Sequence, residues 1–208
     1  MLDPQTILVF MAATLTLNIT PGPDMLYIVA RSMGEGLKAG IISALGIAVG
    51  CLIHTFAIAA GLSRLLTRAP YASMVVKLLG ACYLIYLGLR ALFHRQEPMA
   101  RVQVERAQLW VIFRQGVVTN VLNPKVALFF LAFLPQFVDA RRGSLAMQFV
   151  VLGLLFNTSG TLVNTGVALV SSNAGEWWKR QLSGSSASLL QRATGLVLVG
   201  LGVHLALF

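Results

Sequence analysis

Six long apolar stretches constrain the fold of this 208-residue chain more than any other feature. They cover residues 5–30, 39–62, 72–93, 109–137, 145–172 and 189–208. Each reaches the roughly 20 residues that a helix needs to cross a hydrocarbon core of about 30 Å. Only 11% of the residues are charged, which is too few to cover a soluble surface. Because the alternation of a membrane β-strand is absent, the pattern predicts an all-α membrane protein with six transmembrane helices.

The ends of the spans and their basic residues predict a topology. Met1–Pro4 contains no basic residue, and no small-residue cleavage site follows, so the first stretch is expected to be a retained span rather than a signal peptide. With loops assigned alternately to two sides, four basic residues fall on one side and nine on the other: Arg31, Lys38, Arg90, Arg95, Arg101, Arg106, Arg114, Lys179 and Arg180. The positive-inside rule places the richer side in the cytoplasm and both termini outside the inner membrane. The net charge of +9 is then explained by topology and anionic lipid, without a nucleic-acid partner.

The longest polar segment, 94–108, divides the chain into two similar halves, 1–93 and 109–208. The first span of each half places an Asn shortly before Pro and a charged residue directly after it: Asn18 to Asp24 in one half, Asn120 to Lys125 in the other. The third span of each half places Gly three residues after a basic residue (Lys77 and Gly80; Arg192 and Gly195). Three spans per half is an odd number, so we predict two inverted three-helix repeats joined by a cytoplasmic linker.

The sequence Pro21-Gly22-Pro23 predicts a true break in the first helix, and Pro124 predicts one in the fourth. Two prolines remove two backbone donors, and Gly allows unusual dihedral angles. A simple kink is the alternative, but a kink needs only one Pro. In lipid the freed backbone groups need partners, so each break is expected to line a polar cavity.

Two opposite charges follow these prolines within apolar sequence, Asp24 and Lys125. Asp24 could simply cap the second half-helix, and Lys125 could reach the membrane interface. A charge at the bilayer centre costs at least about 2.5–3.5 kcal/mol, however, which favours a functional role. If the repeat is correct, the two residues face each other, and together they offer partners for both ends of a zwitterionic amino acid.

Polar stripes mark the second and fifth spans. Ser43, Gly46, Gly50 and His54 recur on one face, and the Gly46–Gly50 spacing is typical of close helix packing. His54 could carry a proton or be a hydrogen-bonded core residue. Polar side chains on the fifth span could join helices or line a transport pathway: Asn157, Thr161 and Asn164.

At these residues the chain resembles the LysE/RhtB family of amino-acid exporters. The resemblance is carried by Asn18-Ile-Thr-Pro-Gly-Pro-Asp24 and by Asn123-Pro-Lys-Val-Ala-Leu-Phe-Phe-Leu-Ala-Phe-Leu-Pro-Gln-Phe137. It implies a secondary exporter of amino acids or close derivatives, driven by a proton or another ion. The direction of transport follows from the resemblance alone.

These observations together predict alternating access around the two breaks, with no catalytic residue, metal or cofactor. Asp24 is expected to bind the substrate ammonium or a proton, and Lys125 the substrate carboxylate or Asp24 itself. The freed backbone is expected to bind Asn18, Asn120 and Asn123. The oligomeric state is left open, with a homodimer as one alternative.

Two other functions would need residues in different arrangements. A transmembrane thiol–disulfide oxidoreductase would need Cys51 and Cys82 in reach of each other, and neither is next to a proline break in the sequence. A small-cation exporter would need a dense cluster of His, Cys and carboxylate ligands, which the sequence lacks.

Overall fold

The computed structural model describes residues 2–68 and 107–173 without a gap, together with short pieces of two further segments. Those pieces are residues 78, 81–82, 85–86, 88–89, 92–93, 192, 195–196, 199–200 and 202–203. All regular secondary structure in these residues is helical, as the apolar pattern predicted. Most of the predicted linker 94–108, and most of the predicted third and sixth spans, lie outside the described residues.

The first half begins with two consecutive helices, α1 (Pro4–Ile19) and α2 (Pro23–Glu35), and continues into α3 (Leu37–Arg68). Asp3 starts α1 by accepting a 2.7 Å hydrogen bond from the Thr6 amide, and Pro4 occupies the first helical position, where no donor is needed. Between α2 and α3 the chain turns at Gly36, whose φ of 87° lies in the left-handed region that favours glycine.

The second half begins with α5 (Leu109–Val121) and α6 (Pro124–Leu128). After α6 the chain winds more loosely through the π-helix η1 (Phe129–Phe133) and then tightens into the 3₁₀-helices η2 (Leu134–Phe137) and η3 (Ala140–Arg142). The long helix α7 (Leu145–Asn173) follows. The sequence predicted one apolar span over 109–137; the structure divides it into four helical pieces.

Two helices are each long and apolar enough to cross a membrane, over residues Leu37–Gly61 of α3 and Leu145–Asn173. Two bent pairs pass the same test: α1 with α2, bent by 49°, and α5 with α6 to η2, bent by 45°. The described residues therefore hold two candidate spans, or four if each bent pair is one span. The predicted breaks at Pro21–Pro23 and Pro124 are confirmed.

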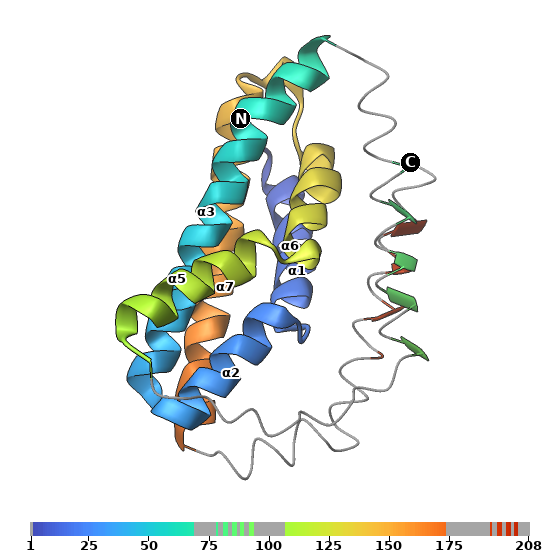
Figure 1. Ribbon diagram of the computed structural model, residues 1–208. Helices are drawn as coiled ribbons and strands as arrows, with labels where there is room; N and C mark the ends of the chain where they lie inside the picture. The colour runs from blue at the N-terminus through green and yellow to red at the C-terminus, as the bar shows by residue number, and fades with distance from the viewer. Residues whose placement is uncertain are drawn as a thin grey trace.

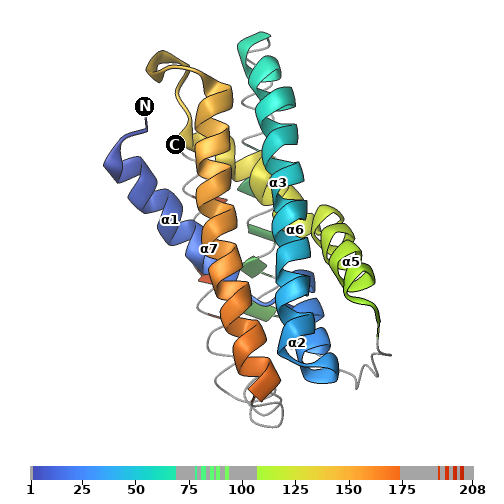
Figure 2. The same ribbon diagram turned by 90° about the vertical axis from the view of Figure 1, so that its left-hand side faces the viewer.

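The long helices α3 and α7 lie side by side, and the bent pairs lie against them (Figures 1 and 2). In Figure 1 the two breaks lie near mid-height of the long helices, with α2 and α5 leading to the lower end and α1 and η2 to the upper end. Figure 2 shows α1 beside α7 and α5 beside α3, on opposite sides of the long pair. This arrangement brings the two breaks together.

Glycines let α3 and α5 approach each other closely. A Cβ added to Gly46 would lie 2.2 Å from the carbonyl oxygen of Phe113, and one added to Gly116 would lie 2.8 Å from that of Ser43. A Cβ on Gly50 would lie 2.8 Å from the Cβ of Asn120. The packing role predicted for Gly46 and Gly50 is confirmed.

The described pieces of the third and sixth predicted spans also pack through glycine. A Cβ on Gly88 would lie 2.7 Å from the carbonyl oxygen of Gly195, and one on Gly202 would lie 2.9 Å from that of Ala81. These contacts place parts of the two apolar stretches against each other, as Figure 1 shows on the right.

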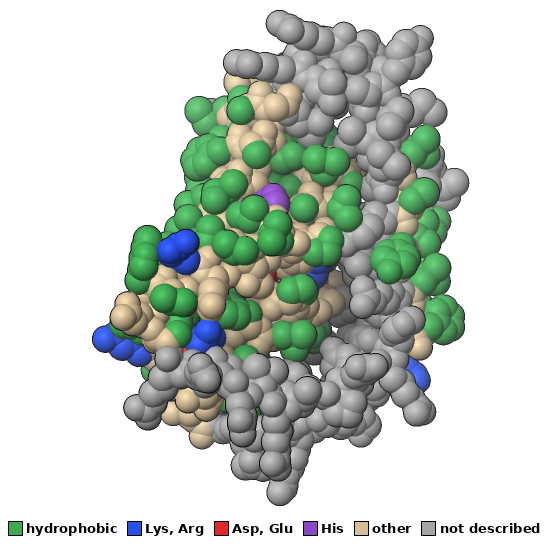
Figure 3. Space-filling model, viewed as in Figure 1, with side chains coloured by type: hydrophobic (Ala, Val, Ile, Leu, Met, Phe, Trp, Pro, Cys, Tyr) green, Lys and Arg blue, Asp and Glu red, His purple; other side chains and the backbone are tan. Residues whose placement is uncertain are grey.

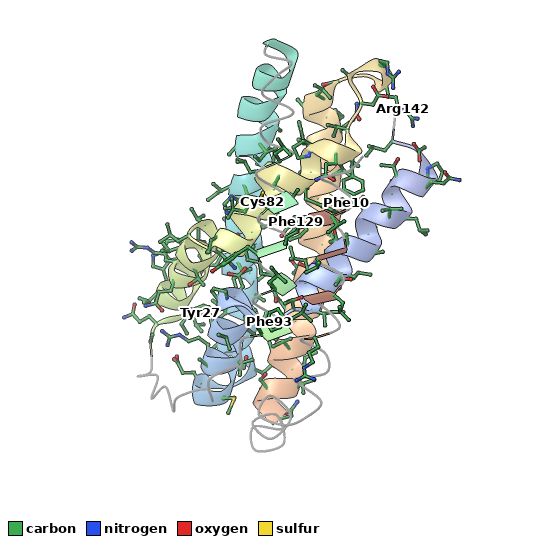
Figure 4. The ribbon with its side chains drawn as sticks, turned by 90° about the vertical axis from the view of Figure 1, so that its right-hand side faces the viewer. Phe10, Tyr27, Cys82, Phe93, Phe129 and Arg142 are labelled. Atoms are coloured by element: carbon green, nitrogen blue, oxygen red, sulfur yellow. The ribbon has the colours of Figure 1, made fainter. Side chains whose placement is uncertain are left out.

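An aromatic core fills the upper part of the described structure. Phe10 of α1 packs edge-on against Phe137, with ring centroids 5.3 Å apart, and Phe129 packs against Phe133 at 4.8 Å. Figure 4 shows Phe10 and Phe129 side by side. The outer surface is also apolar: hydrophobic side chains cover much of the face in Figure 3, with Lys and Arg mostly in its lower half. Such a surface suits lipid.

Candidate functional site: a polar cavity between two helix breaks

A cavity of about 40 Å³ lies where the two breaks meet. It has room for a few water molecules but is smaller than an amino acid requires. Its lining residues come from both breaks and from α3 and α7: Leu17, Asn18, Thr20, Gly22, Asp24, Met25, Ile47, Cys51, Asn120, Asn123, Lys125, Val126, Phe156, Asn157, Gly160, Thr161 and Asn164. Most of the predicted site residues are thus brought together, although they are spread over 147 positions of the chain, from 18 to 164.

The first break frees carbonyls at the end of α1, and Lys125 of the other half binds them. Pro21 has no amide hydrogen, so it cannot donate to Leu17, four residues earlier. The Leu17 carbonyl instead accepts from the Thr20 amide at 3.1 Å and from Lys125 Nζ at 2.7 Å. The same Nζ donates to the Thr20 carbonyl at 2.6 Å. Lys125 therefore points into the protein and not to the membrane interface.

The second break repeats this solution with different residues. Pro124 cannot donate to Asn120, whose carbonyl instead accepts from the Asn123 amide at 3.0 Å. The ring Nε2 of His54 on α3 lies 3.2 Å from the same carbonyl, which makes Nε2 the protonated nitrogen in this contact. Asn123 then caps α6 by accepting a 3.0 Å hydrogen bond from the Lys125 amide. A basic side chain thus binds the carbonyl four residues before Pro21 and the carbonyl four residues before Pro124.

Asp24 is the second residue of α2, after Gly22 and Pro23. Its side chain does not cap α2, which has no side-chain cap. Instead Oδ2 accepts a 2.8 Å hydrogen bond from Asn120 Nδ2, across the two halves. The other oxygen, Oδ1, is buried and has no hydrogen-bond partner among the described residues. A buried acceptor without a donor is costly, so this oxygen suits a ligand that donates.

Asp24 and Lys125 lie on the same cavity but form no direct ion pair. Each is the second residue of its helix, and each reaches the chain just before the opposite break. The two predicted charges, Asp24 and Lys125, therefore line the cavity from equivalent positions of their helices. Their partners are Asn120 for Asp24 and two backbone carbonyls for Lys125.

The three predicted asparagines have different partners. Asn123 binds a backbone amide, as expected. Asn120 binds Asp24, and Asn18 donates to the hydroxyl of Ser159 on α7 at 3.1 Å, so these two bind side chains and not the freed backbone. The sequence did not single out Ser159, which lies two residues from both Asn157 and Thr161 and so on a different side of α7 from them.

The polar stripe of α7 faces the cavity. Asn157, Thr161 and Asn164 all line it, together with Gly160. His54 reaches the site through the Asn120 carbonyl, and its ring lies 5.8 Å from that of Phe130. Pro21 and Pro23 shape the first break, while Gly22 between them lines the cavity.

One cysteine lies closer to the site than the sequence suggested. Cys51 of α3 lines the cavity, so the view that both cysteines lie away from the proline breaks is wrong for Cys51. Helical spacing explains this, because Cys51 follows Gly50, which packs on Asn120. Both cysteines are free thiols, Cys51 buried and Cys82 exposed. Within the described ranges, no group of three or more His, Cys, Asp or Glu side chains could hold a metal ion.

A second polar cluster joins the two halves at the lower end of the molecule; we call it the α2–α5 contact. Arg31 and Glu35 of α2 form an ion pair, and Arg31 Nη2 donates to Gln115 of α5 at 2.7 Å. The Tyr27 hydroxyl donates to the Ile112 carbonyl at 2.7 Å. The topology prediction counted Arg31 among the basic residues of the loops, but Arg31 lies in α2 and is only 8% exposed. Its spacing of four residues from Glu35 was the available signal.

An exposed ion-pair cluster joins the halves at the upper end. Arg142 of η3 pairs with Asp3 at the start of α1 and with Asp139, at 3.6 Å from the latter. Figure 4 shows Arg142 near the upper end of the molecule and Tyr27 in its lower half. The Thr6 amide lowers the pKa of Asp3, and the hydrogen bond from the Arg141 side chain lowers that of Asp139. Both carboxylates therefore stay ionised at neutral pH.

Comparison with known proteins identifies the family of this chain. The model of the LysE-type translocators matches residues 15–207. The chain belongs to the LysE-type translocator family. It is thus a membrane efflux transporter and not an enzyme, as the resemblance in the sequence implied.

Relatives match over nearly their whole length. A "Leucine efflux protein" of Salmonella typhimurium is 29% identical over 203 residues, covering 95% of this chain and 92% of that protein. An "Uncharacterized membrane protein" of Bacillus subtilis is 26% identical over 98% of this chain and 99% of its own length. Another, of Pseudomonas aeruginosa, is 30% identical over 90% of this chain and 88% of its own. No solved structure matches the chain.

Proposed function

We propose that this LysE-type translocator exports a neutral aliphatic amino acid by alternating access around the cavity between the two breaks. The observation that carries the proposal is the cavity lining, which presents one acid and one base, Asp24 and Lys125, beside an apolar wall. An amino acid carries an ammonium group, a carboxylate and a side chain. The three kinds of lining residue correspond to these three parts.

The headgroup would bind between the charges. Asp24 Oδ1, which has no donor among the described residues, is the natural acceptor for the substrate ammonium. Lys125 is the partner for the carboxylate. The same Asp24 oxygen would bind the coupling proton or ion when the substrate is absent. One residue could thus exchange the substrate for the coupling ion.

The side chain would lie against the apolar lining, formed by Leu17, Met25, Ile47, Val126 and Phe156. Asp24 and Lys125 are the only charged residues among the described residues that line the cavity. A lysine or arginine side chain would need a second carboxylate, and Lys125 would repel it. The name of the Salmonella relative supports leucine as the substrate to test first.

Movement would follow from an inverted repeat, in which α1–α3 correspond to the helices from α5 onward. We place the lower end of Figure 1, where α5 begins, in the cytoplasm, because the sequence that precedes α5 is basic. The α2–α5 contact would then close the cytoplasmic side and the Asp3–Arg142 pair the outer side. Export would require these two contacts to open in turn.

Growth on dipeptides tests the substrate. Cells that take up a leucine-containing dipeptide accumulate leucine and stop growing, and overproduction of this chain should relieve that arrest. A lysine-containing dipeptide is the matched control, and its arrest should persist. If growth on both dipeptides is unchanged, the proposed substrate is wrong; if only the lysine dipeptide is relieved, the apolar-wall argument is wrong.

The topology is tested by a cysteine at position 103. Gln103→Cys should react with a membrane-impermeant thiol reagent only after the cells are opened, because the linker is predicted to be cytoplasmic. The unaltered chain supplies the background from Cys51 and Cys82. Labelling of intact cells would reverse the predicted orientation.

A further inference from the structure

Lys125 spans the cavity and binds the end of α1. Its Nζ makes hydrogen bonds of 2.7 and 2.6 Å to the Leu17 and Thr20 carbonyls. Gly22 leaves room for the side chain, since a Cβ there would lie 3.3 Å from Lys125 Cδ. An ammonium group has three hydrogen atoms to donate, so two are used for the backbone of the opposite half.

Asp24 differs from Lys125 in this respect. One of its oxygens is held by Asn120, while Oδ1 is buried with no partner among the described residues. The partner for a substrate ammonium is therefore ready. Lys125, the partner for a substrate carboxylate, already gives two of its three N–H groups to backbone carbonyls. A carboxylate that takes more than the third N–H group must therefore displace a carbonyl.

We propose that the substrate carboxylate displaces the Leu17 and Thr20 carbonyls from Lys125. Only a headgroup with both charges then binds well, and its binding breaks the hydrogen bonds that join α1 to α6. This inference rests on the proposed function and specifies the headgroup that the site accepts. It makes Lys125 both a ligand of the substrate and the connection between the two breaks.

Charge balance gives the same selectivity. Asp24 and Lys125 cancel each other, and a zwitterion leaves the site neutral. An amine without a carboxylate adds an unbalanced positive charge, and a carboxylate without an amine adds a negative one. In a site shielded from water, an unbalanced charge is strongly unfavourable.

The consequence for movement concerns the upper side of the cavity. While Lys125 holds the two carbonyls, the end of α1 stays attached to the start of α6. Once the carboxylate takes the ammonium, the carbonyls need water instead, which requires the α1–α6 side to open. With the predicted topology this is the outer side, so binding from the cytoplasm would favour release to the outside.

Binding of three related ligands to the purified full-length chain tests the inference by calorimetry. The probes are leucine, 3-methylbutylamine, which is leucine without its carboxylate, and 4-methylpentanoate, which is leucine without its ammonium. The wild type should bind leucine at least about tenfold more tightly than either analogue. If the amine binds as tightly as leucine, the inference is wrong, although leucine export can still stand.

Two variants should reverse the order of the ligands. Lys125→Met leaves Asp24 unbalanced, so the amine should bind more tightly than leucine. Asp24→Asn leaves Lys125 unbalanced, so 4-methylpentanoate should become the preferred ligand. Lys38→Met makes the same chemical change outside the cavity lining and should keep the wild-type order. If Lys125 served only to hold α1, the folded Lys125→Met chain would keep that order too, which would overturn the inference.

Hydrogen exchange on the wild type provides a measurement that needs no variant. Leucine should speed amide exchange in the segment that ends α1, residues 17–20, compared with 3-methylbutylamine, because only leucine frees the carbonyls there. Slower exchange with leucine than with the amine would contradict the displacement of Lys125. Absence of leucine binding together with unrelieved dipeptide arrest would instead reject the proposed function itself.

Discussion

Leucine export should stop when Asp24 is changed to Asn or Lys125 to Met, and it should not return when both changes are combined. Each substitution removes one partner of the zwitterionic headgroup and leaves the opposite charge without balance in the cavity. Transport is measured as relief of the dipeptide arrest, and the amount of protein in the membrane is measured alongside. We expect transport in all three variants to fall to the level of cells without the protein.

The stability of the same variants should follow a different pattern. Lys125→Met removes the donor to two carbonyls and leaves Asp24 alone, so it should be the least stable. The double variant removes that lone charge and should recover about 0.5–3 kcal/mol relative to the sum of the single changes. Thermal unfolding of the purified chains in detergent measures this. Recovery of leucine transport in the double variant would show that the pair is structural and that the substrate binds elsewhere.

Much of the fold follows from local features of the sequence. The lengths of the apolar stretches indicate spans, and a Pro inside such a stretch interrupts the helix because it lacks the amide donor, so both breaks were predictable. The Gly46–Gly50 spacing indicated a close contact, because small residues on one face have few other uses in a membrane helix. The polar face of α7 was also readable from its three- and four-residue spacing.

The partners of the site residues were not predictable, because they depend on how the two halves are placed. Nothing near Lys125 in the sequence indicates that it binds carbonyls of residues 17 and 20. Nor does the sequence around His54 show that it binds the carbonyl left free by Pro124. Both contacts supply a donor in place of the amide that a proline more than 60 positions away lacks. The sequence could therefore predict that each free carbonyl needs a donor, but not which residue provides it.

The region after Lys125 shows a second limit of sequence reasoning. The apolar run 126–137 resembles one continuous helix, yet it changes from α to π and then to 3₁₀ geometry. The changes accompany the packing of Phe129, Phe130 and Phe133, all of which are buried. Ring packing of this kind depends on Phe10 and Phe156 from other helices, and hydrophobicity alone does not encode it.

The close contact of α3 and α5 gives the second large expected effect. Gly46→Ala would place a methyl group 2.2 Å from the Phe113 carbonyl oxygen, which belongs to a helix backbone and cannot move aside alone. The two helices would have to separate, and overpacking of this kind costs about 1–3 kcal/mol or more. We expect a clear fall in the unfolding temperature of the purified chain and less protein in the membrane.

Gly61→Ala is the matched control, because it makes the same change in the same helix. A Cβ at Gly61 would meet nothing within 4 Å, and Ala favours a helix by up to about 1 kcal/mol over Gly. Gly61→Ala should therefore leave stability unchanged or slightly raised, with transport intact. Because α5 carries Asn120 into the site, the separation caused by Gly46→Ala should also move the donor that holds Asp24. If Gly46→Ala is as stable and active as Gly61→Ala, α3 and α5 are not packed as closely as this structure has them.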